Sequence, residues 1–574
     1  MILLTICLTG VQITWTVELA YGNPYLQQLN LPHALSALVW LAGPLSGLLI
    51  QPIVGVYSDK CSFRIGRRRP FMLVGGLIVL ASIAMIAYAP EIAQLFTGSK
   101  DAKRNEVLTI MSAVLGFYCL DFSINAVQAS CRSLIVDVAP IHQQETANAW
   151  GGRMIGIGNV VGYFLGFLDL PRFFPFFGHG QMRVFCWLAS IWFALSLGAT
   201  CLAVQEKRYV PKRAEKLRAW YEPLLDIGKA MRGMPETIQR ICLVQFFGWM
   251  GFFPFLFYST TWVGQKAIGM HKGIGDRGRD SDEATRAGSF AMLMYSLISL
   301  ATGFLLPMIT VRRDEDDGRW VDSHLHPVLQ KLKALHYKYL RLPVVWAFAF
   351  WFFVALMFST LFINSVLAAT IVIASVGVSW GIMQWVPFTL LGECINYYND
   401  NRTLPRENPS SAQGSSANLI SGYGSLPRID DDDDDDDDDH IPPYIGASTQ
   451  GIAPSPRASS PTPTTNSTES LEAGMVLGIH NIYIVIPQFF STFMCSVVFT
   501  VFHLIEKRNA PGDKAGDKAV DVLGDLQPDP YDSVGWVLRI GAASGIIAGF
   551  VALRVKEVPR ISGMGNSGVF AAGH

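Results

Sequence analysis

Four polar side chains share one apolar stretch of the sequence, FYCLDFSINAVQASCRSLIVDVAP, and one of them is a carboxylate. Asp121, Asn125, Gln128 and Arg132 are spaced by four, three and four residues. At about 100° per residue, this spacing places all four on one face of a helix. A carboxylate inside a membrane is costly unless it faces a water-filled path or a partner, so the pattern indicates a hydrophilic pathway in which Asp121 binds and releases a proton. The alternative is a polar strip that joins helices by hydrogen bonds.

Arg132 follows Asp121 by eleven residues. A straight helix with a rise of 1.5 Å per residue separates the two by about 16 Å, so their side chains cannot form an ion pair. We therefore expect each of them to find partners on other helices. Arg132 lies near the end of its apolar stretch, where its side chain can reach interfacial water, Asp137 or a carboxylate of another helix.

Glu18 is a second carboxylate within an apolar stretch. Two interpretations are open: a second proton-binding site, or a carboxylate at the membrane interface in contact with water. A single membrane histidine such as His480 is more typical of a hydrogen-bonded packing residue than of a proton relay.

Amide and aromatic side chains in the second half of the chain are candidates for binding a sugar. Sugar hydroxyls need hydrogen-bonding partners, and the C–H faces of a sugar ring stack on aromatic rings. A chance association of Gln384 with Trp385 is the competing explanation, because the chain contains 14 Trp. The candidate substrate-binding residues are Asn125, Gln128, Gln384, Trp385, Asn481 and Gln488.

The composition indicates which elements position these residues. The chain has 574 residues, of which 50% are hydrophobic and 16% charged, with a mean hydropathy of +0.31. Soluble proteins contain roughly 25% charged residues, so the default of a soluble globular enzyme is excluded. The sequence has no H-E-x-x-H, P-loop or G-x-S-x-G motif, and we expect neither an enzyme nor a metal site or cofactor. A polytopic membrane protein is the remaining class.

Apolar stretches long enough to cross a bilayer, roughly 20 residues each, recur about twelve times. The first has no cleavage site of the A-x-A type, so we expect it to be a retained helix. The predicted spans are 2–21, 35–57, 70–95, 107–135, 150–170, 182–204, 240–262, 288–310, 343–362, 365–391, 475–503 and 534–555.

The charges of the connecting segments predict the orientation. The loop between spans 2 and 3 and the linker between spans 6 and 7 are rich in Lys and Arg, whereas the loop between spans 1 and 2 has neither. Basic loops face the cytoplasm, so both termini are predicted to be cytoplasmic. The expected layout is a six-helix half at 1–204, a cytoplasmic linker at 205–239, a second six-helix half at 240–555 and a cytoplasmic tail at 556–574.

Residues 395–474 differ from the rest because they are rich in Ser, Pro, Asn and Thr and include ten consecutive aspartates, Asp430–Asp439. Such a composition cannot bury enough apolar surface to fold, so a disordered cytoplasmic loop is predicted. Without these ten charges the net charge rises from −1 to +9. The basic residues lie between apolar spans, which favours the cytoplasmic side of a membrane over nucleic-acid binding.

Gly158, Gly162 and Gly166 repeat every four residues in span 5. A row of small residues lets a second helix approach closely, so helix packing is the favoured interpretation. Asn159, beside this row, could face a cavity instead.

The segment GVYSDKCSFRIGRRRPF between spans 2 and 3 resembles the signature loop of the major facilitator superfamily. The resemblance implies an all-α membrane protein with twelve transmembrane helices in two six-helix halves. It also implies a conformational role for Gly55, Asp59, Gly66, Arg67 and Arg68. In physical terms, Asp59 can cap a helix end while the arginines anchor at the cytoplasmic surface.

Longer segments resemble the sucrose–proton symporters, which belong to the glycoside–pentoside–hexuronide:cation symporters. Among these proteins, the chain resembles a fungal-type member. The resemblance implies that Asp121 carries the coupled proton and that Arg132 is tied to sugar transport. The outer end of span 7 reads Ser259-Thr-Thr-Trp-Val-Gly-Gln-Lys266 and lacks the acidic residues of plant members, so a coupling role there cannot be carried over. The segments that carry the resemblance are WLAGPLSGLLIQPIVGVYSDKCSFRIGRRRPF, LDFSINAVQASCR, GNVVGYFLG, FGWMGFFPFLFYSTTWVG and HNIYIVIPQ.

The resemblance implies import of sucrose, or of a related α-glucoside such as maltose, with H⁺ across the plasma membrane. The partners expected are the sugar, protons and the lipid bilayer, and not nucleic acid. Two alternatives stay open: an uncoupled or vacuolar sugar transporter, and a non-transporting sugar sensor whose output is the 395–474 loop. The sequence does not indicate an oligomeric state.

Overall fold

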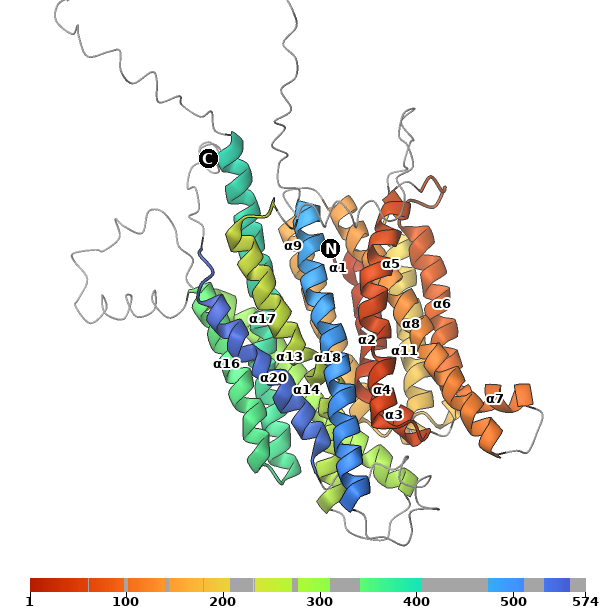
Figure 1. Cartoon of the computed structure of the whole chain (residues 1–574). Helices are drawn as coiled ribbons and strands as arrows, with labels where there is room; N and C mark the ends of the chain where they lie inside the picture. Colours follow the sequence, from red (N-terminus) through yellow and green to blue (C-terminus); the bar gives the residue numbers. More distant parts are fainter. Residues whose placement is uncertain are drawn as a thin grey trace, which may run out of the picture. The chain divides into compact units, whose positions relative to one another are not determined.

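The computed structural model describes a bundle of long helices (Figure 1). Met1–Tyr398 and Leu471–His574 form one unit, and Asn399–Ser470 belong to a second. The predicted linker, the 395–474 loop and the C-terminal tail lie largely outside the described residues, as does the side chain of Asp59. The described residues are 1–59, 61–97, 102–139, 144–178, 180–206, 231, 233–270, 277–309, 341–403, 473–509 and 531–557.

The described residues form helices joined by turns and loops and contain no β-strand. The first half comprises α1 (Ile2–Thr5), α2 (Cys7–Val17), the π-helix η1 (Glu18–Gly22), α3 (Asn23–Gln28), α4 (His33–Val39), α5 (Ala42–Asp59), α6 (Arg69–Ala87), α7 (Ala89–Thr97), α8 (Ala102–Val138), α9 (Gln144–Phe167), α10 (Leu170–Phe173), the 3₁₀-helix η3 (Pro175–Phe177) and α11 (Gln181–Ala203). The second half comprises α13 (Glu236–Met270), α14 (Arg277–Ile309), α16 (Leu342–Ser359), the 3₁₀-helix η5 (Thr360–Phe362), α17 (Val366–Thr403), α18 (Ala473–Asn509) and α20 (Ser533–Ala552).

Eleven helical segments of the described chain are long and apolar enough to cross a membrane. They coincide with eleven of the twelve predicted spans. The remaining predicted span, 150–170, corresponds to α9, which has 24 residues and is therefore long enough to cross a bilayer. Arg153, Asn159 and the glycine row lower the hydropathy of α9.

Proline and glycine mark several helix boundaries. Pro70 and Pro343 stand in the first turns of α6 and α16, where a missing N–H costs nothing. Gly66, with φ +132°, turns the chain from α5 into α6 in a conformation that disfavours a side chain. Pro70 and Gly66 thus mark the end of the short basic loop between α5 and α6.

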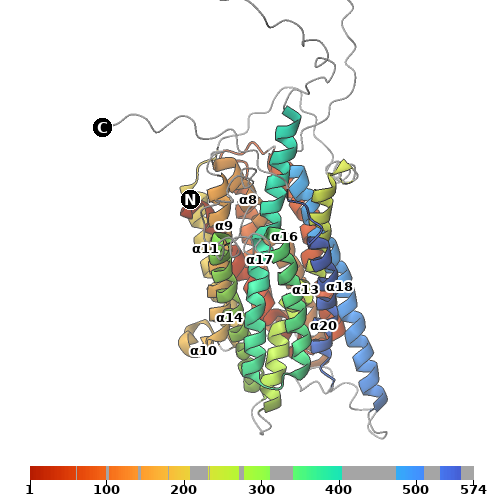
Figure 2. The same ribbon diagram turned by 90° about the vertical axis from the view of Figure 1, so that its left-hand side faces the viewer.

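The helices form two groups that correspond to the predicted halves (Figure 1). In the first group α6 packs against α8, α11 against α2, and α5 against α8. In the second group α13 packs against α20, α14 and α18, and α16 against α20. The view turned by 90° shows the same helices running side by side along the bundle (Figure 2).

The glycine row of α9 serves helix packing, as predicted. A Cβ atom at Gly158 would lie 2.9 Å from the backbone oxygen of Thr9, and one at Gly162 would clash with Thr16. The third glycine, Gly166, faces α14, where a Cβ would lie 3.0 Å from Oγ of Ser289. The row therefore lets α9 approach both α2, in its own half, and α14, in the other half.

The two halves also meet at the end of the bundle that carries α3 and α4. Asn23 Nδ2 of α3 donates a 2.8 Å hydrogen bond to Oγ1 of Thr261 in α13. The Trp40 ring, just after α4, lies 4.8 Å from the Phe257 ring of α13, centroid to centroid. Ser496 of α18 donates to the backbone oxygen of a residue in α4 at 3.2 Å. The halves are thus closed against each other at this end.

Candidate functional site

Asp121 lies in the interior of the 37-residue helix α8 and is fully buried, with 0% of its surface exposed. Neither carboxylate oxygen has a hydrogen-bond partner among the described residues. The side chain faces α5, because a Cβ atom at Gly43 would lie 3.6 Å from Oδ1 of Asp121. A carboxylate without partners is costly to bury in an apolar interior, and such residues within membrane spans are typical of functional sites.

A chain of amide side chains runs from α8 through α5 to the other half of the bundle. Asn125 Nδ2 donates to Oγ of Ser46 at 2.7 Å and to the backbone oxygen of Asp121 at 2.9 Å. Gln51 Nε2 donates to Oδ1 of Asn125 at 2.9 Å, and Asn481 Nδ2 of α18 donates to Oε1 of Gln51 at 3.4 Å. The structure thus connects Asn125 and Asn481, two of the residues predicted to bind substrate.

Gln51 is the connecting residue that the sequence analysis missed. Its signal was available, because it is an amide within an apolar span of α5, directly before Pro52. The polar residues of α8 are recognisable because they recur on one helix face. A single glutamine on α5 forms no such periodic pattern. The role of Gln51 follows only from the packing of α5 against α8 and α18.

The other two residues of the polar face have no such partners. Gln128 is half-buried and Arg132 exposed, and neither forms a hydrogen bond or ion pair with another described side chain. Of the surroundings considered for Arg132, the exposed side chain agrees with interfacial water, and Asp137 is not its partner. Five residues correspond to about 140° around a helix, so the two side chains diverge. Asp137 instead pairs with Arg67 at 2.6 Å and Arg68 at 2.8 Å.

The candidates of the second half are dispersed. Gln488 is buried, but its Nε2 donates to the backbone oxygen of Ile484 in its own helix at 3.0 Å. Gln384 is exposed, whereas Trp385 is half-buried with an Nε1 that lacks a partner among the described residues. None of these three residues forms a hydrogen bond with the carboxylate of Asp121 in the described part of the chain.

His480 is a packing residue, as predicted. Its Nε2 lies 3.1 Å from Nε2 of Gln245 in α13, and its ring meets the Phe388 ring of α17 edge-on at 5.2 Å between centroids. These contacts join α18 to two neighbouring helices of the same half.

Glu18 does not lie at a water-exposed interface. It is only 2% exposed and begins the π-helix η1, where the α-helical hydrogen-bond pattern of α2 is interrupted. Its Oε1 atom has no hydrogen-bond partner among the described residues. π-helical turns occur frequently at functional sites. Of the two interpretations drawn from the sequence, the interfacial carboxylate is therefore wrong.

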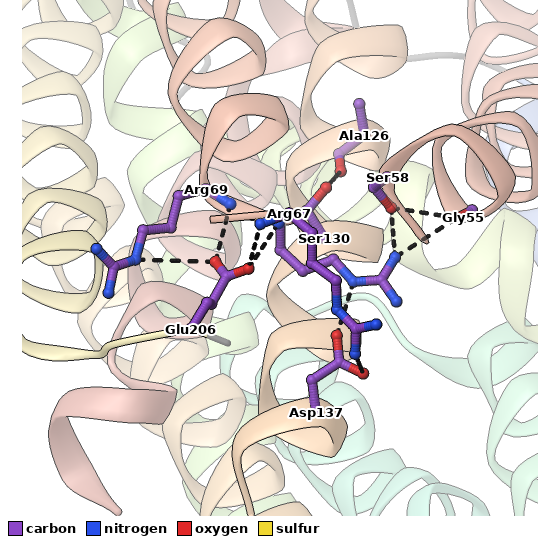
Figure 3. A network of polar contacts seen from close by, with 9 residues as sticks. Gly55, Ser58, Arg67, Arg69, Ala126, Ser130, Asp137 and Glu206 are labelled. Atoms are coloured by element: carbon purple, nitrogen blue, oxygen red, sulfur yellow. Dashed lines mark hydrogen bonds and ion pairs between the residues drawn. The ribbon is translucent and has the colours of Figure 1, made fainter. Parts of the chain in front are cut away.

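The basic loop between α5 and α6 is built around a carboxylate from α11's end (Figure 3). Glu206, whose side chain is 2% exposed, accepts hydrogen bonds from the backbone N–H groups of Arg67, Arg68 and Arg69 at 2.7, 2.8 and 3.0 Å. These N–H groups lie at the N-terminus of α6, where an anion is stabilised by the helix dipole. Sequence analysis missed Glu206, because its partners lie more than 130 residues earlier.

The arginines of this loop bind the ends of α5 and α8. Besides Asp137, the Arg68 guanidinium donates to Oγ of Ser58 and to the backbone oxygen of Gly55, the latter at 3.5 Å. Arg68 is 5% exposed and is held from both sides. Gly55, Gly66, Arg67 and Arg68, all predicted as one functional loop, are thus brought together.

The end of α13, where the sequence departs from plant relatives, is joined to α20. Lys266 Nζ lies 3.5 Å from Oδ1 of Asp532, and the same oxygen accepts from Nε1 of Trp262 at 3.0 Å. The buried Arg539 of α20 pairs with Asp532 as well. The ion pairs hold helices of the second half to each other.

Comparisons with known proteins agree with this architecture. The family described as MFS/sugar transport protein matches residues 6–270. The general alpha-glucoside permease of Schizosaccharomyces pombe is 33% identical over 601 residues, which cover 96% of this chain and 92% of the permease. The sucrose transport protein SUT3 of Oryza sativa subsp. japonica is 33% identical over 329 residues, or 55% of this chain and 65% of that protein.

Solved structures show the same fold at low sequence identity. The nucleoside transporter NupG, in a mutant form, aligns with a TM-score of 0.51 at 11% identity, over 96% of this chain and 99% of that one. A proton-dependent oligopeptide transporter aligns with a TM-score of 0.51 at 9% identity, over 96% and 97%.

Two bundles of long apolar helices with a polar chain between them define a multi-pass membrane transporter of the major facilitator fold, not an enzyme. The chain belongs to the MFS/sugar transport protein family, among the relatives of sucrose transport proteins and α-glucoside permeases.

Proposed function

We propose that the protein imports an α-glucoside, such as sucrose or maltose, together with protons. The observation that carries the proposal is the position of Asp121, which is fully buried, lacks a hydrogen-bond partner and adjoins the amide chain between the halves. The relatives, an alpha-glucoside permease and a sucrose transport protein, support the substrate class.

In this mechanism the proton on Asp121 and the sugar are bound together. The amide groups of Asn125, Gln51 and Asn481 offer donors and acceptors to sugar hydroxyls at the contact of the halves, with exchange of their mutual hydrogen bonds. Neutralisation of Asp121 removes the cost of enclosing a charge, so the loaded transporter can change its conformation. Deprotonation on the opposite side resets the cycle, and the coupling ion H⁺ is the only cofactor that it needs.

The proposed location is the plasma membrane, with both termini in the cytoplasm. The basic loop between α5 and α6 is then cytoplasmic. The end that carries α3 and α4, where the halves touch, is then extracellular, and the described conformation is closed to the outside. A vacuolar location would place the same transporter in another membrane.

Uptake of radiolabelled sugars into proteoliposomes at two external pH values tests the proposal. We expect sucrose or maltose uptake to be faster at pH 5 than at pH 7.5 and to be inhibited by a protonophore. Equal uptake at both pH values, insensitive to the protonophore, would indicate an uncoupled transporter. Absence of uptake for every α-glucoside would contradict the substrate class.

A further inference from the structure

A cavity of about 460 Å³ lies among three helix ends of the second half, and we call it the α20 cavity. It is lined by Arg240 of α13, by Arg341 directly before α16, and by Leu553–Glu557, which follow α20. Pockets that bind small molecules have volumes of roughly 300–1,000 Å³, so the α20 cavity has room for a ligand. It is separate from the amide chain between the halves, none of whose residues line it.

The wall of the α20 cavity is cationic. Four of its seven lining residues are Arg or Lys, and one is acidic. Arg240 pairs with Glu236 of its own helix. Arg554 and Lys556 are exposed and form no ion pair with the described residues, so their two charges are uncompensated there. Two uncompensated cations beside a cavity favour an anionic ligand.

The acidic residue of the wall, Glu557, adds a second requirement. Its Oε2 accepts a 3.0 Å hydrogen bond from Nε of Arg341, whereas its Oε1 is buried and has no hydrogen-bond partner among the described residues. The side chain is only 5% exposed. A buried carboxylate oxygen needs a donor, and a hydroxyl group of a ligand is one. A bare anion without hydroxyls is repelled by the same carboxylate.

The outer face of α20 leads to this cavity. Ile546, Phe550 and Leu553 are spaced by four and three residues and are 43%, 57% and 45% exposed, and Leu553 also lines the cavity. An exposed apolar helix face of a membrane protein contacts lipid, so the cavity at its end lies at the level of the headgroups. In the proposed orientation this end is cytoplasmic, where anionic lipids are concentrated and basic pockets between helices bind their headgroups.

We propose that the α20 cavity binds a phosphorylated polyol. The phosphate binds Arg554 and Lys556, and a hydroxyl group of the polyol donates to Oε1 of Glu557. The inositol phosphate headgroup of a membrane lipid and a soluble sugar phosphate share this chemistry. Bound there, the ligand contacts the ends of α13, α16 and α20 together and stabilises their packing.

Binding of phosphate probes to the purified full-length protein in detergent tests the proposal by calorimetry. The probes are a short-chain phosphatidylinositol phosphate, its soluble headgroup inositol bisphosphate, glucose 6-phosphate and inorganic phosphate. We expect a hydroxyl-bearing probe to bind at least about tenfold more tightly than inorganic phosphate. Tightest binding of the lipid or of its headgroup assigns the site to a membrane lipid, and tightest binding of glucose 6-phosphate assigns it to a soluble sugar phosphate. Equal affinity for inorganic phosphate, or no binding of any probe, would overturn the proposal.

Variants of the wall show whether the probe binds in the α20 cavity. Arg554→Gln with Lys556→Gln removes both uncompensated charges and should weaken binding of the tightest probe at least about tenfold. Lys507→Gln with Arg508→Gln is the matched control, because it removes the same charge from the last turn of α18, outside the cavity. It should leave the affinity within about twofold of the wild type. Equal losses in the two double variants would place the probe elsewhere and contradict the site.

Glu557→Gln provides a second, independent readout. The change removes the repulsion of a bare anion, so inorganic phosphate should bind more tightly and the preference for a hydroxyl-bearing probe should shrink. An unchanged preference would show that Glu557 does not select for hydroxyl groups, and if this variant does not fold, the two double variants decide. The assay contains no proton gradient and measures no uptake, so its outcome is independent of the proposed transport function.

Discussion

The carboxylate of Glu206 accepts a 2.7 Å hydrogen bond from the backbone N–H of Arg67, although the two residues lie 139 positions apart (Figure 3). Two further N–H groups of the loop bind the same carboxylate, so one side chain fixes the start of α6. The guanidinium groups of Arg67 and Arg68 are thereby free to bind Asp137 at the end of α8. The basic loop therefore connects α5, α6 and α8 through specific hydrogen bonds and ion pairs.

The second half has an ion pair at the corresponding position. Val204-Gln-Glu206 follows α11, and Val555-Lys-Glu557 follows α20, the last helix of each half. Glu557 Oε2 accepts from Nε of Arg341 at 3.0 Å, directly before α16. In both halves a carboxylate after the last long helix thus binds the start of the third. The repeat supports the division of the chain into two equivalent halves.

Replacement of Glu206 by Gln should destabilise the protein. Gln retains one acceptor oxygen but loses the charge that binds three N–H groups at a helix N-terminus, a loss of about 1–2 kcal/mol. The melting temperature in detergent should fall by several degrees. Gln205→Ala, which changes the exposed neighbour, should melt like the wild type. A Glu206→Gln protein with an unchanged melting temperature would show that the carboxylate does not hold the loop.

Replacement of Gln51 by Leu should impair sugar transport while the protein is still made. The change leaves Asn125 Oδ1 and Asn481 Nδ2 without their partner and removes a candidate sugar ligand. We expect kcat/KM for the sugar to fall at least tenfold. The loss of one buried polar contact costs about 1.5 kcal/mol, which corresponds to a factor of this size.

The matched control for this variant is Gln12→Leu. Gln12 Nε2 donates to Oδ1 of Asn159 at 2.9 Å, a similar amide pair that lies within the first half. It should alter thermal stability but leave KM within twofold of the wild type. Equal losses of transport in the two variants would show that the chain between the halves has no special role.

Arg132 should be dispensable for folding but required for coupling. It is exposed and unpaired with any described carboxylate, so its removal leaves no buried charge behind. We expect Arg132→Leu to reach the cell surface but to give no sugar-induced proton current, and Arg132→Lys to give a weak one, since Lys keeps the charge but loses the planar fork. Normal surface expression with an unaltered current in the Leu variant would refute the functional role.

Deletion of residues 404–470 should spare transport. These residues lie outside the described part of the chain, and their composition predicts no folded core. We expect the initial rate of uptake, normalised to surface expression, to stay within twofold of the wild type. Loss of a sugar-dependent response without any change in uptake would favour an additional sensing role for the loop.

The sequence allowed the spans, the burial of Asp121 and the packing role of the glycine row to be predicted, because each depends on periodicity within one helix. It did not allow Gln51 and Glu206 to be identified, since their roles depend on contacts between helices far apart in the chain. The partners of Asp137 were missed for the same reason. Its proximity to Arg132 in sequence concealed its contact with a loop nearly 70 residues earlier.

Accumulation of sugar against a gradient by Asp121→Asn tests the central claim most directly. A potential of 100 mV contributes about 2.3 kcal/mol per charge, which corresponds to a roughly 50-fold concentration ratio. Wild-type proteoliposomes with an inside-negative potential and an acidic exterior should therefore accumulate the sugar well above its external concentration. The Asn variant keeps the side-chain size but cannot release a proton, so it should only equilibrate the sugar across the membrane. Accumulation by the Asn variant at the wild-type rate and to the wild-type level would contradict Asp121 as the proton carrier.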